Sequence, residues 1–315
     1  MTDLARWLSA QTQDDTLAGV ILSMAGAGAE IAGVLQQAPI AGQTGPAGAT
    51  NVQGEAQKAL DIISNDIVLN HLRQNPHVSI LVSEELDEAV EMSSQGGFIV
   101  ATDPLDGSSN LDVNVTVGTI FSVLPAAGGP LQAGRVQCAA GYVAYGPATS
   151  LVVRIAGDTS VFTLDGAGTW RLTLAAARVP EATGEFAINT ARERFWDAAT
   201  RGYVHESVAG ETGAAGKRYN MRWVGSMVAD IHRILMRGGI FLYPLDSETA
   251  AKGGRLRLLY EANPMAWLME GAGGRSSTGR QDILDVAPTA IHQRVPVILG
   301  SAEEVRRVED WYRRG

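Results

Sequence analysis

Apolar residues recur at spacings of three and four along the first part of the chain, which is the period of an amphipathic helix. The pattern covers residues 16–38 and returns over residues 56–72, so it predicts one or two helices followed by another. Residues 39–54 are mostly Gly, Ala, Thr, Gln and Pro, with no charge and no period. This composition predicts an irregular loop between the helical segments.

Short apolar runs of strand length come next. Residues 78–82 and 98–101 form two such runs, and each is followed by carboxylates. From residue 111 to residue 174, turn-forming Gly, Pro and Asp residues separate short stretches rich in Val, Tyr, Phe and Thr. This spacing predicts a β-rich middle segment.

The second half of the chain alternates helical and extended patterns. Ser226 is a suitable N-cap for a helix that ends at two glycines, and Ser301 with Glu304 has the spacing of a capping box. The pattern predicts a helix over 227–237, strands over 240–243 and 255–261, a helix over 263–269, a buried strand over 295–299 and a last helix to residue 313.

Strands that alternate with helices around a β-rich middle favour a layered α/β or α+β fold over an all-helical one. The strand spacing is interrupted near residues 179–184, where we place the domain boundary. We therefore expect an N-terminal domain over 1–182 and a C-terminal domain over 183–315.

The charge balance and the single cysteine limit the classes of partner. The chain has 34 acidic and 25 basic residues and a net charge of −9, which repels a nucleic-acid backbone. Cys138 has no second cysteine with which to form an intrachain disulfide, which suits a reducing cytoplasm. The N-terminus lacks the pattern of a signal peptide, and Gly, Pro or Gln interrupt the uncharged stretches. We expect a cytoplasmic protein that binds neither nucleic acid nor membranes.

Acidic residues cluster at three places, 83–85, 103–110 and 259–261, each just past an apolar run of strand length. Strand-end carboxylates can converge in one crevice of an open α/β sheet. Their hard oxygen ligands favour Mg²⁺ or Mn²⁺ over Zn²⁺. In the central cluster, Gly107-Ser108-Ser109 offers backbone N–H groups and hydroxyls that can bind a phosphate beside the metal. The alternative reading of each cluster by itself is an exposed turn or loop.

Several motifs together resemble those of class I fructose-1,6-bisphosphatases. They are Leu60-Asp61-Ile62-Ile63-Ser64-Asn65-Asp66, Ser83-Glu84-Glu85, the octapeptide Asp103 to Asn110, Gly225-Ser226-Met227 and Tyr260-Glu261-Ala262-Asn263-Pro264-Met265-Ala266. The resemblance extends with gaps from about residue 51 to residue 311. It implies a five-layered α/β/α/β/α sandwich, a homotetramer and Mg²⁺-dependent removal of the 1-phosphate of fructose-1,6-bisphosphate. The expected setting is carbohydrate metabolism, in gluconeogenesis or the Calvin cycle.

The resemblance also implies roles for individual residues around the 1-phosphate. The proton acceptors for the attacking water would be Asp61 and Glu85. The substrate's 1-phosphate would be bound at Asp106, Gly107, Ser108 and Ser109. The metal ligands would be Glu84, Asp103, the Leu105 carbonyl, Asp106 and Glu261, with Glu85 and Glu55 nearby.

At the second phosphate the resemblance is incomplete. Asn189, Tyr243, Met227 and Arg222 match the family, with Arg222 reaching in from a neighbouring subunit. Trp223 and Arg192 stand where the family has tyrosines, and Arg255 where it has a lysine. An indole N–H and a guanidinium can both donate to a phosphate, so the site keeps its chemistry with a different shape.

Three alternatives stay open at this point. Sedoheptulose-1,7-bisphosphate is a second candidate substrate, alone or beside fructose-1,6-bisphosphate. An inositol-phosphate type of monophosphatase would share the metal carboxylates but would not need the second phosphate site. A non-catalytic sugar-phosphate sensor would not need the complete set of metal and base carboxylates.

Overall fold

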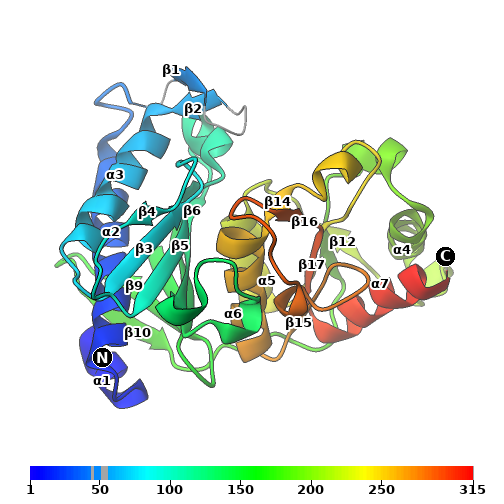
Figure 1. Ribbon diagram of the computed structural model, residues 1–315. Coiled ribbons are helices and arrows are strands. Elements are labelled where there is room, and N and C mark those ends of the chain that lie inside the picture. Colours follow the sequence, from blue (N-terminus) through cyan, green and yellow to red (C-terminus); the bar gives the residue numbers. More distant parts are fainter. Residues whose placement is uncertain (44–45, 51–55, 315) are drawn as a thin grey trace.

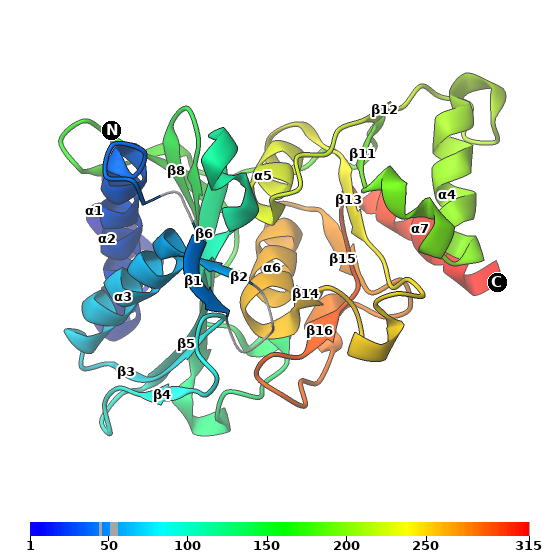
Figure 2. The same ribbon diagram turned by 90° about the horizontal axis from the view of Figure 1, so that it is seen from above.

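The fold is described from a computed structural model, which describes residues 1–43, 46–50 and 56–314. Glu55, expected near the metal ligands, lies outside the described residues. Helices and sheets alternate in five layers, as the view from above shows plainly (Figure 2). The layers are the N-terminal helices, an eight-stranded sheet, a central pair of helices, a five-stranded sheet and an outer pair of helices. The expected α/β/α/β/α architecture is therefore confirmed.

The first sheet contains the predicted β-rich segment. Its strand order is β10-β9-β8-β7-β6-β5-β3-β4. Only β3 and β5 pair in parallel, and the other neighbours are antiparallel. The strands are β3 (Val78–Ser83), β4 (Val90–Glu91), β5 (Phe98–Asp106), β6 (Val117–Pro125), β7 (Ala139–Tyr145), β8 (Thr149–Arg154), β9 (Ser160–Leu164) and β10 (Trp170–Leu174).

Three helices, α1 (Leu4–Gln11), α2 (Asp15–Gln37) and α3 (Ala59–Arg73), cover the outer face of this sheet (Figure 1). The helix α2 approaches β7 so closely that a Cβ at Gly28 would lie 2.7 Å from Val143. By length and composition alone, α2 is also apolar enough to cross a membrane. Half of its apolar stretch is buried inside the fold, as in the core helix of a globular domain.

The second sheet has the order β12-β11-β13-β17-β15. Its strands are β11 (Glu185–Ala187), β12 (Asn220–Met221), β13 (Ile240–Tyr243), β15 (Arg275–Ser277) and β17 (Val297–Gly300). Helices α5 (Met227–Arg237) and α6 (Asn263–Gly271) fill the space between the sheets, and α4 (Ala198–Ala209) and α7 (Ala302–Arg314) cover the outer face. The first sheet ends at Leu174 and the second begins at Glu185, so the proposed boundary near residue 182 falls between them.

Short helices complete the structure. The 3-10 helices are η1 (Ser108–Val113), η2 (Ala126–Gly128), η3 (Gly134–Val136), η4 (Thr190–Phe195), η5 (Gly210–Thr212), η6 (Ala250–Lys252) and η8 (Ile283–Asp285), and η7 (Leu258–Ala262) is a π-helix.

Four sequence predictions are wrong in detail. The expected loop over 39–54 contains β1 (Pro46–Thr50), which pairs antiparallel with β2 (Ala56–Lys58). Backbone hydrogen bonds hold such a hairpin, and they leave no apolar period in the sequence. The strand over 255–261 stops after β14 (Leu256–Arg257), because the buried run continues as the π-helix η7. Periodicity alone does not separate a buried strand from a buried helix.

The strand over 295–299 is split, because Pro296 separates β16 (Arg294–Val295) from β17. The last helix forms as predicted, but Glu304 does not act as its capping residue. Its carboxylate is fully buried and accepts hydrogen bonds from Tyr203, Lys217, Tyr219 and Arg307. Burial against these donors takes the place of the capping contact.

Candidate active site

A cavity of about 350 Å³ opens where the ends of β3 and β5 meet α5 and the π-helix η7. Most of the predicted site residues line it. They are Asp61, Glu84, Glu85, Asp103, Leu105, Asp106, Gly107, Ser108, Ser109, Trp223, Met227, Tyr243, Arg255 and Glu261. Six carboxylates and three basic side chains line the cavity, so its wall has an excess of negative charge.

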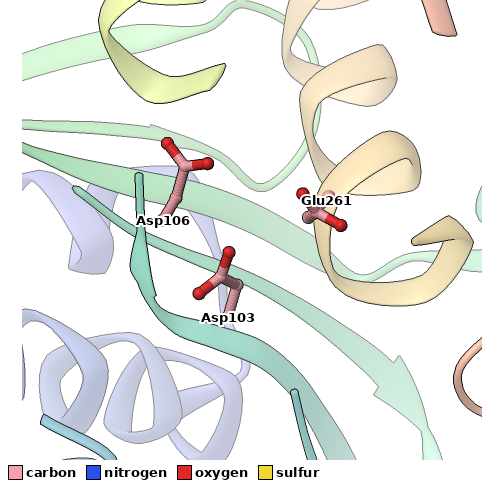
Figure 3. Close-up of side chains that lie close together, drawn as sticks. All are labelled: Asp103, Asp106 and Glu261. Carbon is pink, nitrogen blue, oxygen red and sulfur yellow. The ribbon is translucent and has the colours of Figure 1, made fainter. Parts of the chain in front are cut away.

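A β-bulge in β5 brings Asp103 and Asp106 to the same face of the sheet. In a regular strand, residues three apart project from opposite faces. Here Asp103 pairs with Ile120 and Asp106 pairs with Gly118, so β5 has one more residue than β6 in this interval. Oxygen atoms of Asp103, Asp106 and Glu261 consequently lie within 4.8 Å of one another (Figure 3).

The N-terminus of α5 binds the Asp106 carboxylate. Its Oδ2 accepts hydrogen bonds from the Ser226 hydroxyl at 2.9 Å and from the Val228 N–H at 2.8 Å. Ser226 is the N-cap of α5, as predicted. The positive end of the helix favours a carboxylate at this place, and the contact joins the strand β5 to a helix of the second half.

Arg257 is the buried cation closest to the cluster. Its guanidinium is 3.0 Å from the Glu84 carboxylate, and its backbone N–H donates to Glu261 Oε2 at 2.6 Å. Arg257 directly precedes the π-helix η7, and Glu261 lies four positions later within it. In this helix the Glu261 carboxylate turns back toward the Arg257 backbone. Glu84 and Glu261 are thereby held on one side of the cavity.

Burial and mutual repulsion raise the pKa values of the carboxyl groups in the acidic cluster. Burial, followed by repulsion from Glu84, Asp106 and Glu261, holds the pKa of Asp103 well above its usual range. Burial raises the pKa of Glu261 to about 8, although Arg257 opposes this. Burial also raises the pKa of Asp106, against the opposing hydrogen bonds from α5. An added positive charge would stabilise the charged form of these carboxylates.

The predicted proton acceptors Asp61 and Glu85 line the same cavity. Asp61 is in the first turn of α3, where its carboxylate accepts from the Lys58 backbone N–H at 2.8 Å. Glu85 follows Glu84 directly after β3, and its backbone N–H donates to Ser83. Both side chains face the cavity that contains the acidic cluster.

The predicted phosphate-binding turn begins at Gly107, which has a φ of +79°. A Cβ there would lie 2.7 Å from the Ser226 side chain, so glycine is required by both conformation and space. Ser108 then starts the 3-10 helix η1. The turn places backbone donors and two hydroxyls beside the carboxylates.

Aromatic side chains also line the cavity. The Trp223 ring stacks on Phe241 at 5.7 Å, and Tyr243 meets it edge-on at 5.8 Å. Arg255 lines the same cavity. Asn189 instead caps η4 and, with Trp223 and Tyr243, lines a small adjoining hollow.

Arg192 and Arg222 are engaged elsewhere in this chain. Arg192 is held by Asp246 at 2.6 Å and by Glu248 at 2.8 Å, and it lines the same small hollow as Asn189. Arg222 pairs with Glu185 at 2.9 Å and does not line the main cavity. Within one subunit, therefore, Arg222 is not brought to the site.

The comparison with known families agrees with this geometry. Residues 5–175 match the family described as "Fructose-1-6-bisphosphatase, N-terminal domain", and residues 179–313 match its C-terminal domain. The chain belongs to the class 1 fructose-1,6-bisphosphatase family. It is 50% identical over 315 residues to the class 1 enzyme of Neisseria meningitidis serogroup A, with 97% of both chains covered.

Other relatives cover the chain to a similar extent. The class 1 fructose-1,6-bisphosphatase of Shewanella amazonensis is 47% identical over 97% of this chain and 98% of its own. The crystal structure of Leishmania major fructose-1,6-bisphosphatase in its holo form superimposes with a TM-score of 0.93 at 32% identity, over 98% of both chains. The family resemblance inferred from the motifs is confirmed.

The structure adds residues to this site that the sequence did not reveal. Arg257 and Phe241 line the cavity, but both lie in runs that look like ordinary strands. Lys58 also lines it and is paired with Asp112 at 2.9 Å. A basic residue within an otherwise apolar run, next to an acidic motif, was the one available signal for Arg257.

Proposed function

We propose that this chain hydrolyses the 1-phosphate of fructose-1,6-bisphosphate to give fructose-6-phosphate and inorganic phosphate. The observation that carries the proposal is one cavity lined by two chemically distinct sets of residues. Carboxylates and the Gly107 turn make up one set, and Trp223, Tyr243 and Arg255 make up the other. This arrangement suits a substrate with two phosphates, and the curated relatives are named as fructose-1,6-bisphosphatases.

The buried carboxylates fit a hard divalent cation. Glu84, Asp103, Asp106, Glu261 and the Leu105 carbonyl would hold Mg²⁺, or Mn²⁺ in its place. Three of these carboxylates can reach a common point, and their raised pKa values reflect a shortage of positive charge. When bound, the cation supplies positive charge for the phosphoryl oxygens and lowers the pKa of a bound water.

The chain's own groups would carry the remaining steps. Asp61 and Glu85 accept the proton of the attacking water, which requires a carboxylate within hydrogen-bond reach of it. The backbone N–H groups of Gly107 and Ser108 and the hydroxyl of Ser109 orient the 1-phosphate. Asp106 would help to hold the cation, and its carboxylate is fixed to the N-terminus of α5.

The second phosphate would bind beside the aromatic residues, to Arg255 and Tyr243, with Asn189 at the margin and Met227 against the sugar. Trp223 is held there by stacking on Phe241. We further propose a cytoplasmic homotetramer in which Arg222 of one subunit completes the site of its neighbour. Its position outside its own cavity, half-exposed and paired with Glu185, is compatible with such a role.

The test is phosphate release from fructose-1,6-bisphosphate, sedoheptulose-1,7-bisphosphate and inositol-1-phosphate, each with and without Mg²⁺. We expect Mg²⁺-dependent turnover with the highest kcat/KM for fructose-1,6-bisphosphate. A preference for the seven-carbon bisphosphate would reassign the substrate, and a preference for inositol-1-phosphate would remove the second phosphate site from the proposal. Binding without turnover of any of them would indicate a sensor.

A further inference from the structure

The bulge that brings Asp103 and Asp106 together faces one residue of β6. Pro104 and Leu105 lie between the two paired positions of β5, and Thr119 is the only residue between their partners Ile120 and Gly118. Thr119 is buried and points to the same face of the sheet as Tyr145 on β7. The geometry of the acidic cluster therefore depends on what holds this short interval in place.

A chain of hydrogen bonds runs from Tyr145 through Thr119 to the bulge. The Thr119 hydroxyl donates to the Pro104 carbonyl at 2.8 Å and lies 2.7 Å from the Tyr145 hydroxyl. A threonine hydroxyl has one proton, and a carbonyl can only accept. Since that proton goes to Pro104, Tyr145 must donate to Thr119. Burial raises the pKa of Tyr145, so its hydroxyl stays protonated and able to donate.

The chain continues through one peptide group to a carboxylate of the cluster. The Pro104 carbonyl and the Leu105 N–H belong to the same peptide unit, and this N–H donates to Asp103 Oδ1 at 3.0 Å. Thr119 thus holds one side of a peptide whose other side holds Asp103. Successive hydrogen bonds of this kind polarise one another, so each donor strengthens the next.

We propose that Thr119 and Tyr145 are positioning residues for the cation site. They fix the peptide between Pro104 and Leu105, whose N–H sets the direction of the Asp103 carboxylate. Neither residue lines the cavity that contains the acidic cluster, so both act through the bulge. The inference rests on the proposed metal-dependent function.

The competing explanation is that the Thr119 hydroxyl only satisfies a buried carbonyl. The chain offers a matched control for it in Thr159. This threonine is equally buried, and its hydroxyl donates to the Leu268 carbonyl at 2.7 Å, at the far end of α6. Replacing either hydroxyl removes the same kind of bond, but only Thr119 is connected to the acidic cluster.

The experiment measures Mn²⁺ affinity directly, by electron paramagnetic resonance of free Mn²⁺, in chelator-treated protein without substrate. The variants are Thr119→Val, Thr119→Ser, Tyr145→Phe and Thr159→Val. We expect Thr119→Val to weaken Mn²⁺ binding about 10- to 100-fold, the usual range when a residue supporting a metal ligand is lost. Thr119→Ser should remain within about threefold of wild type, and Tyr145→Phe should lose about three- to tenfold, as the loss of one hydrogen bond predicts. Thr159→Val should bind Mn²⁺ as wild type does.

Wild-type Mn²⁺ affinity in Thr119→Val would overturn the inference. It would also be overturned if Thr119→Ser or Thr159→Val lost as much Mn²⁺ affinity as Thr119→Val. If Thr119→Val does not fold, Tyr145→Phe decides, and unchanged Mn²⁺ affinity in that variant would overturn it. A wild-type protein that binds no Mn²⁺ and hydrolyses no sugar bisphosphate would instead contradict the proposed function. The two failures are thereby distinguished.

Discussion

Two groups of buried carboxylates in this protein have opposite surroundings. Asp103, Asp106 and Glu261 lie together between the sheets. The neighbouring Glu84 forms an ion pair with the guanidinium of Arg257. Glu304 lies alone between α4 and α7, where its carboxylate accepts from Lys217 at 2.6 Å, from Arg307 at 2.8 Å and from two tyrosine hydroxyls. Burial is nearly complete in both places.

The difference shows that burial of a carboxylate does not by itself mark a functional site. Glu304 is matched by two basic side chains and two tyrosine hydroxyls, and it stabilises the packing of α7 on α4. The pKa of Asp103 is raised by burial and by neighbouring carboxylates, which means that the cluster lacks positive charge. A divalent cation would supply that charge. The following predictions test whether the two groups really have these separate roles.

The largest effect should come from Asp103→Asn. The substitution keeps the volume but removes one charge from the cluster, so we expect kcat to fall by about a thousandfold or more, since metal catalysis contributes several kcal/mol. The fold should persist, because the cluster gains stability when it loses repulsion. Kinetics with fructose-1,6-bisphosphate and thermal unfolding measure the two effects, and near-wild-type turnover would refute the metal assignment.

Glu304→Gln should give the reciprocal result. It leaves Lys217 and Arg307 without their buried partner, and breaking such a group costs about 3–5 kcal/mol of unfolding free energy. Turnover of the folded fraction should be unchanged. Glu303→Gln is the matched control, because the Glu303 carboxylate is half-exposed and makes only a long contact, 3.7 Å, with Lys217. We therefore expect its unfolding free energy to change by no more than about 0.5 kcal/mol. Denaturant unfolding measures both, and equal losses would remove the distinction between the two glutamates.

Asp61→Asn separates the proton acceptor from the cation ligands. We expect kcat to fall about a hundredfold, the lower range for loss of a general base, with little change in KM or Mg²⁺ affinity. A titration of activity against Mg²⁺ distinguishes the roles. A large loss of Mg²⁺ affinity would move Asp61 into the ligand set.

A smaller pH effect should arise from His232, a half-buried histidine of α5. Burial lowers the pKa of His232, and its Nδ1 lies 2.9 Å from the Tyr142 hydroxyl. The unfolded chain therefore binds this proton more readily, so stability is complete above about pH 6.5 and falls as the pH drops below it, by at most about 1.4 kcal/mol per pH unit. His232→Gln should flatten the pH dependence of the unfolding free energy between pH 7.5 and 5.5. An unchanged slope would show that His232 is not responsible.

Much of the fold could be predicted from the sequence because its elements have clear periods. The helices α2, α3 and α5 and the strands β3 and β13 follow their apolar patterns. The short helix α1 and the helix α4 were missed, since neither carries a long apolar stripe. The hairpin β1–β2 and the π-helix η7 were missed because they are defined by backbone geometry, which leaves no apolar period in the sequence.

The site could be predicted only where recognisable sequence motifs contain its residues. The acidic cluster and the Gly107 turn were found from their residue types and from the family resemblance. Strand alternation alone would place Asp103 and Asp106 on opposite faces, and the bulge that unites them leaves no pattern in the sequence. The contribution of Arg257 likewise depends on long-range pairing with Glu84, which no local spacing reveals.

The most direct test of the central claim is phosphate release from fructose-1,6-bisphosphate after exhaustive chelation, followed by addition of Mg²⁺. The acidic cluster is short of positive charge, so the chelated protein should release no phosphate and added Mg²⁺ or Mn²⁺ should restore turnover. Full activity of the chelated protein, with no further gain from Mg²⁺, would contradict the account.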